Sequence, residues 1–131
     1  MSDVKVIRYL LANSAPLVAV VSAAKITAGL VSQGTALPAI AVTHVSGVWN
    51  SEISQQGRQC TARVQVTVMA STYPQQKQIM ALIRSAVPRT RGTINGVSVD
   101  SILREPDGPD FRDDEAGIFM QTQDFFVKFN D

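Results

Sequence analysis

The chain contains a single histidine and a single cysteine, so few of the side chains that usually build a catalytic or metal site are available. His44 lies between Thr43 and Val45 in a strand-like segment, and no cysteine or carboxylate accompanies it at the spacing of metal ligands. We interpret His44 as structural, the alternatives being a general base or a metal ligand. Cys60 begins another strand-like run without any pattern of a reactive thiol, and we expect it to be a small buried or half-buried structural residue.

Carboxylates cluster near the C-terminal end of the chain. They are Asp110, Asp113, Asp114 and Glu115. Hard cations prefer such groups, but the spacing does not follow a calcium-loop pattern. A solvated loop is therefore favoured over a site for an ion bound between subunits.

A small basic cluster occupies residues 89–92, with Arg89 and Arg91 as its cations. Two arginines just after a helix also stabilise the negative end of that helix, so this role is favoured over phosphate contact. No phosphate loop, dinucleotide fingerprint, nucleophile elbow or zinc spacing occurs anywhere in the chain. The sequence thus predicts no catalytic, cofactor-binding or metal residues, and a protein that is not an enzyme.

Chain length and net charge further limit the kinds of protein that this sequence can encode. A chain of 131 residues is expected to form a single domain over residues 1–131 with a core of its own. Twelve basic residues against eleven acidic ones give a net charge of +1, which lacks the basic excess of nucleic-acid-binding proteins. DNA near this protein is expected to pass without being tightly bound. The apolar run at residues 15–24 is shorter than the roughly 18 residues of a membrane span, so a short core helix or turn and no membrane role are expected there.

Hydrophobic periodicity predicts two helices and about five strands. An apolar stripe predicts a helix over residues 2–13, and a second stripe predicts a helix beginning after Thr72, which would cap it, and ending at Val87. Strands are predicted at residues 25–31, 39–46, 63–70, 97–105 and 118–129, with long polar connections at 47–57 and 106–117. We expect an α+β fold, with a mostly antiparallel sheet of about five strands and two amphipathic helices packed on one face.

These pieces, in this order and spacing, resemble the tail-completion proteins of siphophages, also called tail-terminator or head-to-tail joining proteins. The resemblance covers nearly the whole chain, although residues 49–56 match no family pattern. It is carried by the helix with Leu10-Leu11, by residues 34–42 entering a strand, by 62–73 running into the second helix, by 97–102, by the acidic loop 113–117 and by the strand at 122–127.

The resemblance implies a virion structural protein of a phage or prophage, assembled in the host cytoplasm and located at the head-proximal end of the tail. Such proteins form a ring, of six copies, that caps the tail tube, ends tail polymerisation and offers a surface to the connector on the filled head. The implied partners are further copies of the chain, the tail tube protein and the head-side connector protein, with DNA passing through the ring.

A ring needs a heterologous interface, in which one patch meets a different patch on the neighbour. The exposed face of the central strand, the polar middle of the last strand and an open sheet edge are candidates, the alternative being that these faces are merely solvated. The predicted interface residues are Arg63, Gln65, Thr67, Gln121, Gln123, Trp49, Glu52, Asp113 and Asp114.

Two other functions stay open at this point. One is a head-side neck adaptor between portal and tail. The other belongs to a different class, a small-molecule-binding or metal-dependent enzyme that uses His44 and the acidic loop from Asp113 to Glu115.

Overall fold

The computed structural model describes residues 2–29, 36–50, 59–89 and 91–130. Its elements are α1 (Ser2–Ala12), α2 (Ala15–Val18), a 3-10 turn (Ala23–Lys25), β1 (Ile26–Ala28), β2 (Ala39–Asn50), β3 (Gln59–Ala70), α3 (Tyr73–Ala86), β4 (Gly92–Ile94), β5 (Val97–Arg104), β6 (Phe111–Asp113) and β7 (Ile118–Asn130).

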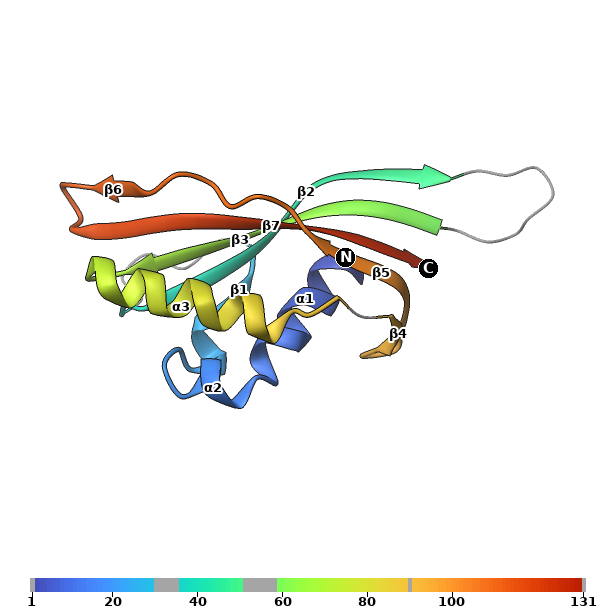
Figure 1. Ribbon diagram of the computed structural model, residues 1–131, viewed down its shortest axis with the longest axis horizontal. Coiled ribbons are helices and arrows are strands. Elements are labelled where there is room, and N and C mark those ends of the chain that lie inside the picture. Colours follow the sequence, from blue (N-terminus) through green and yellow to red (C-terminus); the bar gives the residue numbers. More distant parts are fainter. Residues whose placement is uncertain (1, 30–35, 51–58, 90, 131) are drawn as a thin grey trace.

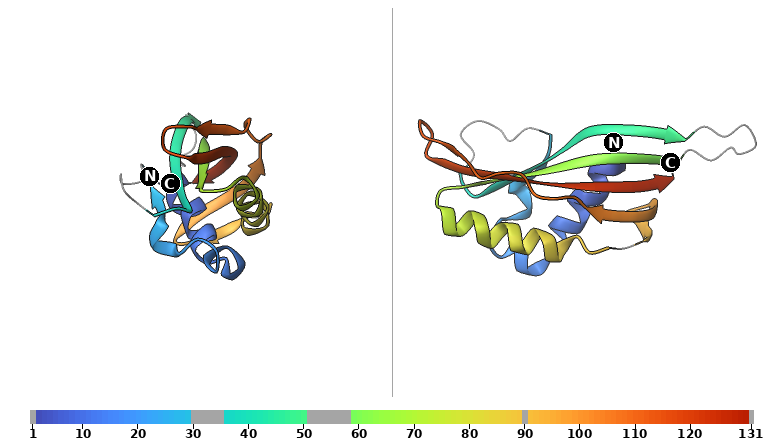
Figure 2. Two further views of the ribbon diagram at one scale, coloured as in Figure 1. Left: turned by 90° about the vertical axis from the view of Figure 1, so that its left-hand side faces the viewer. Right: turned by 45° about the horizontal axis from the view of Figure 1, so that its top comes forward.

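One curled sheet joins all seven strands (Figures 1 and 2). The strand order is β1-β2-β3-β7-β5-β4, and β6 pairs with β7 beside the end of β5. Every pair is antiparallel except β1 with β2, which is parallel. In the view of Figure 1 the three α-helices lie below the long strands, and β6 with the turn after it projects at one end of the molecule.

The α+β class and the mostly antiparallel sheet are confirmed, but the sheet has seven strands where about five were expected. The two additional strands, β4 and β6, have three residues each. Three residues are too few to show an alternating pattern, so these strands are defined by the neighbours with which they pair. Four residues of the predicted 47–57 loop, from Gly47 to Asn50, continue β2 instead.

Alternation of side chains explains the core. In β3 every second residue is buried, including Val64, Val66 and Val68, while the residues between them are partly exposed. The helices complete this core with Ile7 of α1 and Ile79 of α3, both fully buried. Full burial of an aliphatic side chain of this size contributes about 1.5–3 kcal/mol.

Local signals place α3 as predicted. The Thr72 hydroxyl accepts a hydrogen bond from the Gln75 backbone N–H at 3.3 Å, and Pro74 lies in the first turn, where its missing N–H costs little. The apolar run after residue 14 forms the short helix α2, with Leu17 buried, as expected. No helix in the described part of the chain is long and apolar enough to span a membrane.

Candidate subunit interface

The predicted interface residues of β3 lie on the sheet face opposite the core. Arg63, Gln65 and Thr67 are partly exposed there. Arg63 is engaged within the chain, because its Nε donates to the Asp124 carboxylate at 2.6 Å and its guanidinium lies 5.6 Å from the centre of the Phe126 ring. Gln65 and Thr67 therefore present the freer polar surface of this strand.

Gln121 and Gln123 are buried on the core face of β7, opposite Val68 and Val66 of β3. The Gln121 side-chain amide donates to the Gly108 carbonyl at 3.0 Å, and the Gln123 amide donates to the Glu105 carbonyl. Both amides thus satisfy backbone groups of the segment after β5. The polar middle of β7, from which subunit contacts were predicted, is hydrogen-bonded to the segment after β5. It therefore offers almost no exposed surface to a neighbour.

Residues 105–110, which we call the strap, run along β7. The Glu105 N–H donates to the Asp124 carbonyl and the Gly108 N–H to the Thr122 carbonyl, each at 2.9 Å. A Cβ atom at Gly108 would lie 2.5 Å from the Thr122 hydroxyl oxygen, so this close approach requires glycine. The strap is therefore fixed along β7 by backbone hydrogen bonds, while most of its residues stay exposed to solvent.

Two ion pairs attach the strap to α3. Lys77 Nζ lies 2.6 Å from the Asp110 carboxylate, which also accepts a hydrogen bond from the Tyr73 hydroxyl at 2.7 Å. The hydrogen bond from Lys77 lowers the pKa of Asp110 below its ordinary value of 3.8, and the same bond raises the pKa of Lys77 above 10.5. Arg84 pairs with Asp107 further along the helix. Asp110 is exposed, as predicted for a solvated loop carboxylate, and it also forms an ion pair with Lys77.

The remaining carboxylates project on the turn between β6 and β7. Asp113 Oδ1 accepts a hydrogen bond from the Ala116 N–H at 3.2 Å, and Arg112 lies 3.2 Å from Asp114. The Asp114 side chain is 85% exposed. No group of three or more potential metal ligands (His, Cys, Asp or Glu) occurs among the residues that the structure describes. The turn therefore presents acidic surface without a preformed cation site.

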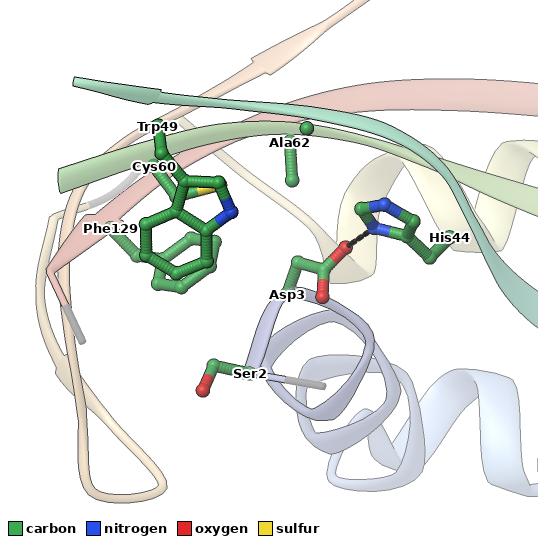
Figure 3. Close-up of a pocket in the computed structure, with 8 residues that line it drawn as sticks. Ser2, Asp3, His44, Trp49, Cys60, Ala62 and Phe129 are labelled. Atoms are coloured by element: carbon green, nitrogen blue, oxygen red, sulfur yellow. Dashed lines mark hydrogen bonds and ion pairs between the residues drawn. The ribbon is translucent and has the colours of Figure 1, made fainter. Parts of the chain in front are cut away.

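His44 meets a carboxylate that sequence spacing did not indicate. Its Nδ1 pairs with Oδ2 of Asp3, a residue 41 positions away at the start of α1 (Figure 3). The Asp3 side chain is 1% exposed, and its second oxygen has no hydrogen-bond partner among the described residues. The pair connects α1 to β2. Because the two residues are far apart in the sequence, no local pattern could reveal the pairing.

A pocket of ≈ 310 Å³ lies beside this pair (Figure 3). Its lining residues are Ser2, Asp3, His44, Gly47, Trp49, Cys60, Ala62 and Phe129. Trp49 packs edge-on against Phe129 with ring centres 6.1 Å apart, yet remains 53% exposed. Among the described residues of the lining, Asp3 is the only carboxylate, and the turn after β6 lies at the end of the molecule away from the start of α1 (Figure 1). The structure does not bring His44 and the Asp113–Glu115 loop together, which contradicts the enzyme site that combined them.

The other predicted positions are placed as follows. Cys60 is buried, as expected. Arg89 and Arg91 are exposed, and Arg89 shares a pocket of ≈ 350 Å³ with Arg84 and Arg104. Glu52 lies outside the described residues.

The matches to known proteins include a family model and a solved structure that both cover nearly the full length of the chain. The model of a family described as "Tail completion protein gp17" matches residues 5–129. A chain from a solved structure titled "Virion of native gene transfer agent (GTA) particle" superposes with a TM-score of 0.69 over 98% of this chain and 94% of that chain. At 13% sequence identity this likeness shows a shared fold. None of the curated proteins matches.

Proposed function

Because the chain belongs to the family of tail completion protein gp17 and is a structural protein of a phage-like particle, we propose that it caps the head-proximal end of the tail tube. There it ends tail polymerisation and provides the surface to which the head is joined. The observation that carries the proposal is the family match over residues 5–129, supported by a fold shared over almost the whole chain with a virion protein.

The proposed assembly is a ring of six copies, each a single domain, formed in the host cytoplasm and retained in the virion. Its partners are the tail tube protein on one side and the head-side connector on the other. The partly exposed polar face with Gln65 and Thr67, the exposed Trp49 and the acidic residues Asp113 and Asp114 supply different patches, as a heterologous ring requires.

Neutral overall charge supports a passage for DNA through the ring without specific binding. The net charge of the chain is +1, whereas tight DNA binding needs many phosphate contacts from clustered cations. We also propose no catalytic role. In the described part of the chain, the pocket beside His44 offers one carboxylate, and that carboxylate is occupied by the histidine.

Deletion of the gene in the prophage that carries it tests the proposal. Electron microscopy of induced lysates should show tails of abnormal length that are not joined to heads, and a plasmid copy should restore finished particles. Tails of normal length joined to heads would contradict the proposal. Free tails of correct length beside heads that leak DNA would instead identify a head-side neck adaptor.

A further inference from the structure

One edge of the sheet remains open. β2 has 12 residues, but β1 pairs with only three of them, Ile40 to Val42, and the last hydrogen bond runs from the Gly29 N–H to the Val42 carbonyl at 2.8 Å. Between Thr43 and Trp49, no strand in the described part of the chain pairs with the side of β2 that faces away from β3. Such an edge presents unpaired backbone donors and acceptors to another strand.

Apolar surface accompanies this open edge. Val45, Val48 and Trp49 are 49%, 67% and 53% exposed, and they make up three of the seven exposed large hydrophobic residues in the described structure. A groove of ≈ 610 Å³ lies between α1 and β2 where β1 ends. Its lining residues are Val4, Lys5, Arg8, Ala28, Gly29, Val42, Thr43 and His44. Exposed apolar residues and a groove on the same strand are features of an interaction site.

The groove carries positive charge that no carboxylate of the described residues neutralises. Lys5 is exposed, and Arg8 donates from Nε to the Ile26 carbonyl at 2.9 Å, so its charge has no carboxylate partner there. Neither side chain takes part in an ion pair within the described residues. The described residues of the groove's lining include no carboxylate. The expected occupant is therefore an extended segment that is both apolar and acidic.

The β6–β7 hairpin has these properties. Phe111 is 60% exposed, and the turn that follows it carries Asp113, Asp114 and Glu115 against the single cation Arg112. β6 pairs with β7 on one side only, so among the described strands its other edge is free. The hairpin projects at one end of the molecule, away from α1, whose residues line the groove (Figures 1 and 2).

We propose that the β6–β7 hairpin of one copy docks along Thr43–Trp49 of β2 in the next copy. Phe111 enters the groove between α1 and β2, and the acidic turn faces Lys5 and Arg8. The two surfaces lie on different parts of the same chain, so repetition of the contact generates a head-to-tail ring. This inference rests on the proposed function, because it names the subunit contact of the proposed ring.

Cysteine crosslinking in assembled particles tests the contact. The pair Val45→Cys and Arg112→Cys is placed in a Cys60→Ala background and supplied to the deletion strain. Within one copy, β3 and β7 lie between these positions, and the strand spacing alone keeps them at least roughly 14 Å apart, which exceeds the about 7 Å between Cα atoms that a disulfide tolerates. Oxidised particles should therefore give a ladder of covalent multimers, and each single-cysteine variant should stay monomeric. A ladder with the control pair Val45→Cys and Leu103→Cys, but not with Arg112→Cys, would overturn the inference.

Charge reversal gives a second test that does not depend on disulfide geometry. Lys5→Glu and Glu115→Lys should each lower the yield of finished particles about tenfold, and the two together should restore it. Arg91→Glu is the matched control, since it reverses an exposed cation outside the groove and should not rescue Glu115→Lys. Rescue by Arg91→Glu, or no rescue by Lys5→Glu, would reject the docking. Both results leave the proposed function standing if deletion still gives unjoined tails of abnormal length.

Discussion

In the described structure the chain covers the middle of β7 itself but leaves most of the outer side of β2 without a partner. Beyond β7 the strap is held by backbone hydrogen bonds, by Gln121 and Gln123, and by two ion pairs with α3. Beyond β2, from Thr43 to Trp49, nothing comparable occurs in the described structure, and exposed apolar side chains accumulate there. The comparison teaches that polar side chains in a strand do not by themselves mark an interface. Here the polar side chains of β7 bind the strap within the chain, while the strand edge available to a partner, on β2, is the more apolar one.

The largest expected effect on stability comes from the pair that connects α1 to β2. His44→Leu leaves the buried Asp3 carboxylate without its partner, which costs about 3–5 kcal/mol at a fully buried site. Because the His44 side chain is 30% exposed, we expect a loss of about 2–3 kcal/mol in the free energy of unfolding, measured by chemical denaturation. His44→Asn, which keeps a donor near the position of Nδ1, should lose less than half as much. Equal stability of His44→Leu and wild type would show that the open side does not depend on this pair.

A smaller loss in the free energy of unfolding is expected for a substitution on β7, where the strap binds. Gln123→Leu conserves volume but leaves the Glu105 carbonyl without its side-chain donor, so we expect a loss of about 1–2 kcal/mol. The control is Gln65→Leu, the same change on the opposite face of the sheet, which should stay within about 0.5 kcal/mol of wild type. Native-state hydrogen exchange should locate the loss of protection at the strap. Equal effects of the two substitutions would remove the distinction between buried and exposed glutamines.

The middle of β7, where the strap binds, shows how far the sequence could lead. β3 and α3 were predicted because their signals are local: every second residue is apolar in β3, and Thr72 caps α3. The hydrogen-bond partner of Gln123 could not be predicted, because a glutamine in a strand has the same local sequence pattern whether water or the strap covers it. The pairing of Asp3 with His44 joins residues 41 positions apart, and only the folded topology brings them together. Sequence reasoning therefore selected Trp49 and Asp114, which are exposed, and also Gln121 and Gln123, which are buried.

The ion pair between Lys77 of α3 and Asp110 of the strap should contribute less to stability than the Asp3–His44 pair or Gln123, because both of its side chains are about 40% exposed. Asp110→Asn should lower the melting temperature slightly at neutral pH. The pKa of Asp110 is depressed in the folded state, so its contribution is present above 3.8 and lost as the pH falls through the lower folded value. The pKa of Lys77 is raised, so the contribution is also lost as the pH rises above 10.5. A difference in melting temperature that persists unchanged below the folded pKa of Asp110 would assign it to something other than the ion pair.

The smallest effect on folding is expected at the open edge, and it should coincide with a large effect on assembly. Val48 is 67% exposed, so Val48→Lys should change the free energy of unfolding by less than about 0.5 kcal/mol. A lysine on an edge strand opposes the approach of a second strand, and the variant should therefore fail to restore finished tails to the deletion strain. Leu103→Lys makes the same change at another exposed apolar position and should restore them. Val48→Lys removes no contact that appreciably stabilises the folded chain. A defect confined to assembly would therefore arise from a surface that does not contribute to the stability of the isolated protein. Normal complementation by Val48→Lys would show that the open edge is not where copies of the chain meet.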